Sequence, residues 1–376
     1  GAPTGVRAVH PVPMIGIFAA VNAKYSRTSL AVRPVSAYAR LAVLEDIHIW
    51  ERTINHRYSL LLRELGLLAS EAEAIIFSLY IWNVDLLTRL AEDLRLLYPH
   101  LVLAAAGPEC SYRPSDFLAA HPALDYVLAG EGEYATTAFL GELAHRPCEK
   151  RRTRLPDNCP SVVGRGWATP TAQPLSMETL PFPYEDLKQL QGRILYYESM
   201  RGCPFRCAYC LSAAEAGGVR YRPLEQVFQH LEQFLMARPR QVKFVDRTFN
   251  CDRDRALSIW RWLAERDNGV TGFHFEIAGD LLDEASMTFL ATLRPGLVQF
   301  EIGVQSTNPE TLRAIRRGDR LDMLFVNVER LSLPRNIHLH LDLIAGLPHE
   351  GYDRFAQSFN RLYACKPNQL QLGFLK

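Results

Sequence analysis

The sequence predicts an α/β protein built in two parts, an N-terminal doubly wound Rossmann-like domain followed by a six-strand partial (β/α) barrel. Two series of short apolar runs alternate with amphipathic stretches of helical period, a pattern typical of parallel strands covered by helices. A proline-rich segment separates the two series, and long helices do not form where proline recurs. The 376 residues are long enough for two domains.

The first series lies in residues 1–146, which we expect to form the Rossmann-like domain. Leu87, Leu90 and Leu94 keep a spacing of three and four residues, so one face of that helix is apolar. In such sheets ligands bind at the carboxyl ends of the strands. The expected strands are 14–21, 46–50, 74–80, 101–106 and 125–129, and the expected helices are 29–44, 58–68, 84–97 and 135–145.

Residues 147–192 are expected to form an ordered linker, with a small hairpin around 161–169, because seven prolines fall within 147–183. The second series, residues 193–376, contains six strand–helix units, fewer than the eight of a full barrel. Its expected strands are 194–199, 242–245, 272–277, 298–303, 338–344 and 369–372, and its expected helices are 223–237, 252–267, 283–293, 309–317, 323–332 and 353–364.

Composition excludes several classes of partner. The formal net charge is +1 and 22% of residues are charged, so we expect no broad attraction to nucleic acid or to a membrane surface. No apolar run reaches the ~18–20 residues of a membrane span. The N-terminus lacks the pattern of a secretory signal, and the five cysteines outside residues 203–210 lack the spacing of a disulfide framework. We therefore expect a cytoplasmic protein in reducing surroundings.

Three cysteines are spaced C-x₃-C-x₂-C at Cys203, Cys207 and Cys210. Three thiolates on one short loop can hold three corners of an iron–sulfur cube and leave the fourth iron open to a ligand. Structural zinc sites usually have four ligands in paired spacing, and here His230 and Cys251 stand alone. The motif therefore favours a [4Fe–4S] cluster, with these cysteines as its metal ligands and catalytic centre.

The motif resembles the signature of the radical S-adenosylmethionine (SAM) enzymes. In that family the open iron chelates SAM, and one electron cleaves SAM to a 5′-deoxyadenosyl radical. The family has a six-strand partial barrel with the cysteines after the first strand, and here they follow the expected strand 194–199. The resemblance implies that Tyr209, the aromatic residue before the third cysteine, contacts the adenine.

The resemblance also implies SAM contacts at the ends of later strands. Asp246 would accept from the SAM ammonium, and Arg247 would pair with its carboxylate. The alternative for this segment is a turn and a helix N-cap at Asn250 or Asp252. His274 is interpreted as a satisfied core residue and is left out of the site. The implied SAM contacts are Tyr209, Asp246, Arg247, Glu276, Glu301, Gln305, Ser306 and Ile344.

A Rossmann-like domain before such a barrel resembles the cobalamin-binding radical SAM enzymes, which implies a cobalamin-type first domain. The loop 21–29 contains no histidine, so a histidine lower ligand from this loop is excluded. Tyr25 or Arg27 would cover the lower face of the corrinoid instead. The other implied contacts follow the third, fourth and fifth strands and are Ser78, Leu79, Tyr80, Gly107, Pro108, Glu109, Gly130, Glu131, Gly132 and Glu133.

Together these resemblances imply a cobalamin-dependent radical SAM enzyme, most simply a methyltransferase, with a [4Fe–4S] cluster, SAM and cobalamin as cofactors. One alternative is a radical SAM rearrangement, ring contraction or cyclisation without methyl transfer. Another is a non-catalytic corrinoid or cluster sensor. The expected partners are a small-molecule or peptide substrate and an electron donor such as flavodoxin or ferredoxin. Nothing in the sequence identifies the substrate.

Overall fold

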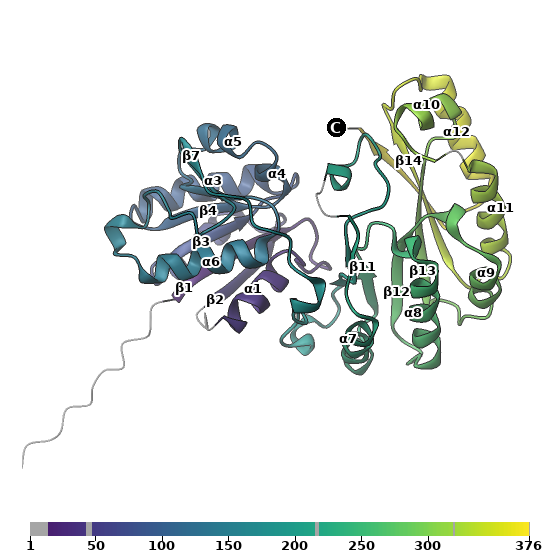
Figure 1. Ribbon diagram of the computed structural model, residues 1–376, viewed down its shortest axis with the longest axis horizontal. Helices are drawn as coiled ribbons and strands as arrows, with labels where there is room; N and C mark the ends of the chain where they lie inside the picture. Colours follow the sequence, from purple (N-terminus) through teal and green to yellow (C-terminus); the bar gives the residue numbers. More distant parts are fainter. Residues whose placement is uncertain (1–13, 43–46, 215–217, 319, 376) are drawn as a thin grey trace, which may run out of the picture. The chain divides into compact units, whose positions relative to one another are not determined.

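The computed structural model describes residues 14–42, 47–214, 218–318 and 320–375. The chain divides into two compact units (Figure 1). One contains the residues up to Leu175 together with Pro181–Glu185, and the other contains Ser176–Leu180 and the residues from Asp186 onward. The expected helix end at 44 and strand start at 46 lie outside the described residues.

The first unit is a doubly wound sheet whose strand order is β2-β1-β3-β4-β5-β6-β7. The first five of these are parallel, and their order is typical of folds that bind ligands at the carboxyl ends of the strands. The strands are β1 (Met14–Asn22), β2 (Ile47–Thr53), β3 (Ala72–Ser78), β4 (Val102–Ala106), β5 (Tyr126–Leu128), β6 (Val162–Gly164) and β7 (Trp167–Ala168).

Helices cover both faces of this sheet. Leu61, Leu65 and Leu87 belong to a buried cluster on one face, while Phe139 and Leu143 belong to a second cluster on the other. Burial on both faces explains why these strands are almost continuously apolar. The helices are α1 (Val32–Leu41), α2 (Tyr58–Ala69), α3 (Val84–Leu97), α4 (Pro108–Ser111), α5 (Pro114–Ala120) and α6 (Gly132–His145). The short helices α4 and α5 were not predicted.

The proline-rich segment adds to the first sheet. β6 pairs antiparallel with β5, and β7 pairs antiparallel with β6, within the range where a hairpin was expected. The hydroxyl of Tyr126 donates to the carbonyl oxygens of Arg151 and Thr153, at 2.8 and 2.7 Å. These hydrogen bonds hold the turn before β6 against β5. This part of the segment is therefore integral to the first unit.

The second unit contains an open parallel sheet of six strands in the order β15-β14-β13-β12-β11-β8. The strands are β8 (Leu195–Tyr197), β11 (Gln241–Phe244), β12 (Gly272–Ile277), β13 (Val298–Gln305), β14 (His338–Ala345) and β15 (Gln369–Phe374). The helices are α7 (Leu224–Ala237), α8 (Arg253–Glu265), α9 (Glu284–Leu290), α10 (Pro309–Ala314), α11 (Leu321–Ser332) and α12 (Tyr352–Ala364). The predicted α/β fold class, a doubly wound sheet followed by a second sheet of six parallel strands covered by helices, is confirmed.

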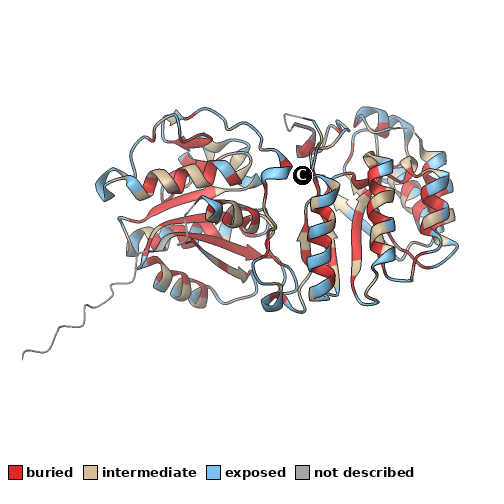
Figure 2. Ribbon diagram, turned by 60° about the horizontal axis from the view of Figure 1, so that its bottom comes forward, coloured by how far each residue is buried: buried red, intermediate tan, exposed pale blue. Residues whose placement is uncertain are grey.

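The apolar core of the second unit lies between the sheet and its helices, where Figure 2 shows the helices buried on one side and exposed on the other. Phe275 is fully buried there, with ring centroids 4.3 Å from Phe249 and 4.6 Å from Phe244. Among the described residues, no helix is both long and apolar enough to cross a membrane.

Replacing Phe275 with Ala is expected to lower the free energy of unfolding by about 3–5 kcal/mol, because the ring leaves a cavity in a rigid aromatic cluster. Leu333→Ala is a suitable control, since Leu333 is 78% exposed and its loss should change stability by less than about 0.5 kcal/mol. Urea denaturation followed by circular dichroism measures both, and equal effects would contradict the placement of the core.

Candidate active site

The three cysteines lie on a loop whose ends are joined by a small antiparallel ribbon. β9 (Met200–Arg201) precedes the loop and pairs with β10 (Arg220–Tyr221) after it. Gly202 links β9 to the loop with φ +87°, and a Cβ there would lie 2.2 Å from the carbonyl oxygen of Gly218. Only glycine fits this turn. The ribbon was not predicted from the sequence.

The cysteine side chains differ in exposure. Cys207 is buried, Cys203 is half-buried and Cys210 is exposed, and all three are free thiols. Cys203 Sγ lies 3.4 Å from Thr248 Oγ1, which follows β11. Three unpaired soft ligands on one short loop fit the donor set of an iron–sulfur cluster with one open iron.

A buried carboxylate fixes the chain just before this loop. Asp246 is fully buried and accepts hydrogen bonds from the backbone N–H groups of Ser199 and Met200, at 2.8 and 3.1 Å, and from the Ser199 hydroxyl. Burial raises the pKa of Asp246 to about 7, although the three hydrogen bonds favour the ionised form. The expected contact between Asp246 and the SAM ammonium conflicts with this burial, and Asp246 is instead a positioning residue.

Arg317 is the main site residue that sequence reasoning missed. It follows α10, and its Nη1 lies 3.7 Å from Cys207 Sγ and 3.3 Å from the Tyr209 hydroxyl. Its Nη2 donates to the carbonyl oxygen of Gly303 in β13. A guanidinium beside a thiolate stabilises the negative charge that metal binding requires. The only sequence signal was a basic pair before a glycine, Arg316-Arg317-Gly318, which had been assigned to the end of a helix.

Tyr209 and Ile344, two of the expected SAM contacts, lie in the same apolar cluster. Both pack against Leu312, Ile315 and Leu347. Burial raises the pKa of Tyr209 to about 12, so its hydroxyl stays protonated. The structure therefore brings these residues, which are far apart in the sequence, together beside the cysteine loop.

Arg247 and Glu276 lie close enough for their charges to interact. Arg247 is exposed, and its guanidinium forms no hydrogen bond or ion pair with another described residue, so it is available to a ligand. Burial raises the pKa of Glu276, an effect that the positive charges of Lys243 and Arg247 oppose. Both residues keep the positions expected of polar groups at strand ends.

The segment after Glu301 in β13 is irregular. The pairing of β13 with β14 shifts between Gly303 and Gln305, and Gln305 has φ +70°. The Gln305 side-chain oxygen is buried without a hydrogen-bond partner among the described residues. Ser306 is fully buried, and its hydroxyl donates to Glu350 at 2.5 Å and accepts from the Asn308 N–H at 3.0 Å. The expected contact between Ser306 and SAM conflicts with this burial, whereas Gln305 stays a candidate.

Glu301 is the centre of a charged network on the same strand. Its Oε2 lies 2.9 Å from Lys243 Nζ, 3.1 Å from His274 Nε2 and 3.7 Å from His340 Nδ1. Burial would raise its pKa, but the hydrogen bonds from His274 and Lys243 hold that pKa well below its usual range. An oxygen shared in this way is a weak acceptor for a further donor, so the SAM contact of Glu301 stays a prediction.

Two other side chains of the second unit stabilise turns, as the structural alternative anticipated. Asp252 caps α8 by accepting from the Arg255 N–H at 3.0 Å. Asn250 joins the turn after β11 to the end of β12 through two hydrogen bonds of 2.9 Å with the backbone of Ala278.

In the first unit, the expected cobalamin contacts lie along one edge, where β1, β3, β4 and β5 end. Gly107 has φ +112°, and a Cβ there would lie 2.5 Å from the carbonyl oxygen of Leu79. Tyr25 and Arg27 are exposed on the loop after β1. Glycine backbone and exposed loop side chains at one strand edge fit a large planar ligand.

The remaining contacts at this edge differ in exposure. Ser78, Leu79 and Glu133 are buried, so a contact from these positions comes mainly from the backbone. Gly130 has φ +82° with open space beside it. The partly or fully exposed members of the set are Tyr80, Gly107, Pro108, Glu109, Gly130, Glu131 and Gly132.

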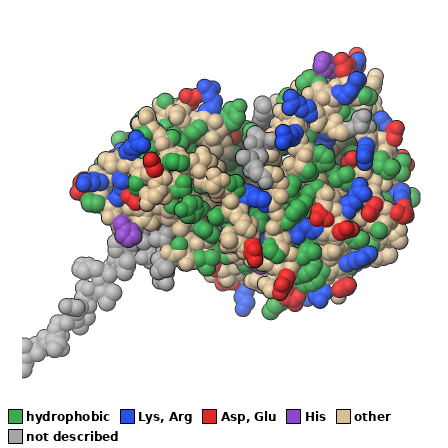
Figure 3. Space-filling view, in the orientation of Figure 1, with side chains coloured by type: hydrophobic (Ala, Val, Ile, Leu, Met, Phe, Trp, Pro, Cys, Tyr) green, Lys and Arg blue, Asp and Glu red, His purple; other side chains and the backbone are tan. Residues whose placement is uncertain are grey.

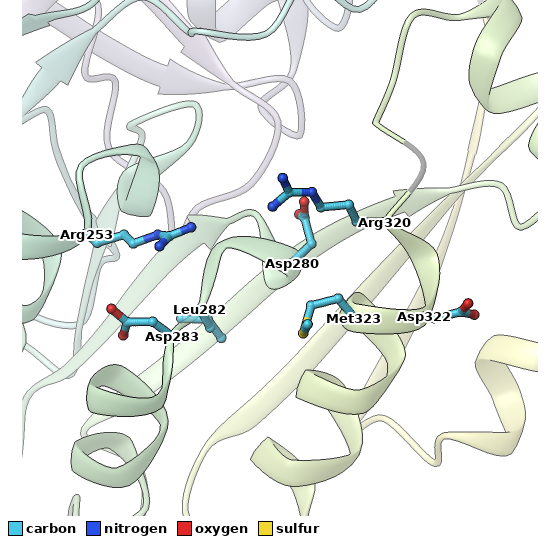
Figure 4. A pocket seen from close by; sticks show the side chains of 7 residues that line it. All are labelled: Arg253, Asp280, Leu282, Asp283, Arg320, Asp322 and Met323. Atoms are coloured by element: carbon cyan, nitrogen blue, oxygen red, sulfur yellow. The ribbon is translucent and has the colours of Figure 1, made fainter.

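Two pockets of the second unit lie at the starts of its helices. The larger, of about 420 Å³, is lined by Arg253, Asp280, Leu282, Asp283, Arg320, Asp322 and Met323 (Figure 4). A smaller pocket of about 50 Å³ shares Asp280 and Arg320 with it and adds Phe205 of the cysteine loop and Arg317. The smaller pocket therefore reaches the cysteine loop. On the face shown in Figure 3, acidic and basic side chains are interspersed.

Comparison with known proteins agrees with this geometry. Residues 197–362 form a segment that matches the radical SAM superfamily. It contains all three cysteines together with Tyr209 and Arg317.

Two curated relatives are named as methyltransferases. The 2-(S-pantetheinyl)-carbapenam-3-carboxylate methyltransferase of Streptantibioticus cattleyicolor is 29% identical over 335 residues, which are 80% of this chain and 46% of that protein. The cobalamin-dependent radical SAM methyltransferase TokK of Streptomyces tokunonensis is 28% identical over 78% of this chain and 45% of that protein. The chain thus spans about half the length of the curated relatives it matches.

Solved structures share the fold of both units. TsrM from Kitasatospora setae, a radical SAM methyltransferase with cobalamin and a [4Fe–4S] cluster bound, has a TM-score of 0.74 at 14% identity, over 96% of this chain and 71% of its own. OxsB, with aqua-cobalamin and SAM bound, has a TM-score of 0.71 at 18% identity, over 92% of this chain and 51% of its own. The chain therefore shares the fold of these two structures.

Asp246→Ala is expected to lower the free energy of unfolding by about 3 kcal/mol and to reduce the iron retained after reconstitution, because three buried donors lose their acceptor. Asp246→Asn should cost less than half as much, since an amide can accept from the backbone and donate to Ser199. Urea denaturation and iron analysis test both variants. Equal losses of stability and iron in the Ala and Asn variants would show that the charge of Asp246, and not its hydrogen bonding, is responsible.

Gly202→Ala is expected to reduce iron retention at least several-fold, because the added methyl group meets backbone at Gly218. Gly192→Ala is the matched control. Gly192 has a similar φ of +79°, but no atom lies within 4 Å of the added Cβ, so only the cost of about 1–2 kcal/mol for the left-handed backbone remains. Iron content and thermal stability should separate the two, and identical behaviour would rule out the close approach.

Proposed function

We propose that the chain is the core of a cobalamin-dependent radical SAM methyltransferase. The observation that carries the proposal is the cysteine loop, with Arg317 beside Cys207 and Tyr209, in a chain whose two units share the fold of TsrM and OxsB. Both relatives reported above are named as methyltransferases, and one as cobalamin-dependent.

When bound, the cluster supplies the electron that cleaves SAM, and cobalamin carries the methyl group. Cys203, Cys207 and Cys210 hold the cluster, and Arg317 offsets negative charge at Cys207. Arg247 is available for the carboxylate of SAM, and Tyr209 and Ile344 offer apolar surface to its adenine. In the first unit, the glycine backbone at 107 and 130 and the exposed Tyr25 and Arg27 would hold the corrinoid.

For the substrate we propose a small molecule rather than a peptide, in line with the carbapenam named for one relative. An electron donor such as flavodoxin or ferredoxin would reduce the cluster, in the reducing cytoplasm that an oxygen-sensitive centre needs.

A second candidate keeps the radical chemistry without methyl transfer. The anaerobic magnesium-protoporphyrin IX monomethyl ester cyclase of a Synechocystis strain is 24% identical over 75% of this chain. Formation of S-adenosylhomocysteine together with 5′-deoxyadenosine favours methyl transfer, whereas 5′-deoxyadenosine alone favours cyclisation or rearrangement. A non-catalytic sensor would form neither product.

Cys203→Ala is expected to lower 5′-deoxyadenosine formation more than 100-fold, because the cluster loses one of three protein ligands. Cys365→Ala, at a cysteine outside the motif, should behave as the unmodified protein. The assay uses anaerobically reconstituted protein with SAM and a chemical reductant, and the products are separated chromatographically. SAM cleavage that survives Cys203→Ala would refute the role of the loop, and zinc in place of iron would refute the cluster.

A further inference from the structure

The face of the second sheet that is turned away from its helices carries ionisable side chains. On β11 to β14, this inner face presents Lys243, His274, Glu276, Glu301, His340 and Asp342. The alternate residues on these strands, such as Phe275 and Phe300, are buried toward the helices. Barrel interiors are usually filled by bulky apolar residues. The inner face is therefore not built as a hydrophobic core.

Three of these side chains converge from three adjacent strands. One nitrogen of His274, one nitrogen of His340 and one oxygen of Glu301 all lie within 4.8 Å of one another. His274 Nε2 and His340 Nδ1 lie 3.1 and 3.7 Å from Glu301 Oε2. Two ligands bound tetrahedrally at about 2.1 Å from a metal ion lie roughly 3.4 Å apart, so the observed separations bracket a coordination shell.

The surroundings of the two imidazoles support this arrangement. His274 is 3% exposed and His340 is 5% exposed, so both rings are more than nine-tenths buried. His340 Nε2 faces Asp342 Oδ1 at 3.0 Å, on the side of the ring away from Glu301. The geometry of this contact is not that of a hydrogen bond, so it is an electrostatic contact that places a carboxylate behind the ring, as is common behind metal-binding histidines. His274 faces Glu301 with Nε2, while its Nδ1 is buried without a hydrogen-bond partner among the described residues, so Nε2 is the ring nitrogen placed to bind an ion.

Lys243 would compete with a metal ion for the carboxylate of Glu301. Its Nζ lies 2.9 Å from Glu301 Oε2 and 3.8 Å from Glu276 Oε1. A metal ion on Glu301 would displace the ammonium group by electrostatic repulsion, and Glu276 is the carboxylate nearest to receive it. The lysine then acts as an internal cation that neutralises Glu301 while no metal is bound.

We propose that His274, Glu301 and His340 form a binding site for one divalent transition-metal ion, separate from the three-cysteine loop. Two imidazoles and one carboxylate are a ligand set found for zinc and for non-haem iron(II), and it leaves coordination positions open. An ion held there would face the inner side of the sheet, where it can accept an oxygen or nitrogen atom of a small molecule.

The test uses the cluster-loaded protein and zinc alone as the probe. Equilibrium dialysis with metal analysis should show one more zinc bound by the unmodified protein than by His274→Ala or His340→Gln, which keep every cysteine. His338→Ala is the matched control, because His338 lies on the same strand as His340 but outside the triad, and it should bind zinc like the unmodified protein. Lys243→Met should bind at least tenfold more tightly, since the competing charge is gone.

Equal zinc content in the unmodified protein and in the two histidine variants would overturn the proposal. Zinc bound only after Lys243→Met would also overturn it, because Lys243 would then be the native occupant of Glu301. Unchanged circular dichroism and iron content show that each variant is folded. Should His274→Ala fail to fold, His340→Gln and Lys243→Met decide the question, and neither result depends on methyltransferase activity.

Discussion

The buried carboxylate of Asp246 determines where the first strand of the second sheet stops and the cysteine loop starts. It binds two consecutive backbone N–H groups and a hydroxyl at Ser199 and Met200, and Arg255 donates to the Ser199 carbonyl from the other side. A carboxylate without exposed surface is costly, and only a full set of donors offsets the desolvation. The segment 199–200 is thereby held, and Gly202 turns the chain directly into the loop.

Arg317 makes a second connection, between the cysteine loop and β13. One guanidinium contacts a cysteine, the tyrosine before the third cysteine and the backbone of Gly303. A Cβ at Gly303 would lie 2.2 Å from the side-chain nitrogen of Gln305 and 3.5 Å from Arg317 Nη2, so a larger residue there would require these two side chains to move. Arg317 therefore links the irregular end of β13 to the cysteine loop.

Most of the regular helices and strands could be predicted from the sequence. β14 was expected at 338–344 and spans His338–Ala345, because polar and apolar residues alternate in its sequence and a turn follows it. The ribbon of β9 and β10 was not predicted, since two-residue strands show no periodicity in the sequence. Cys203, Cys207 and Cys210 were recognisable from local spacing alone.

The side-chain roles were harder to foresee, because they depend on partners distant in sequence. Asp246 and Ser306 stand at strand ends, where polar residues commonly face ligands, but their partners Ser199 and Glu350 bury them. Arg317 lay in what looked like a helix terminus, and only the folded chain places it 3.7 Å from a cysteine sulfur 110 positions earlier.

The polar inner face of the second sheet has a consequence for how such a protein can diverge. Hydrophobic stabilisation of this sheet comes almost entirely from the side that packs on the helices, where Phe244, Phe275 and Phe300 are buried. Substitutions on the opposite side remove little apolar area, provided that charges are exchanged together with their partners. Selection can therefore change the side chains of the inner face while the sheet, its helices and the cysteine loop stay unchanged. A sheet whose apolar core lies on one side only can thus adapt its other face to new substrates.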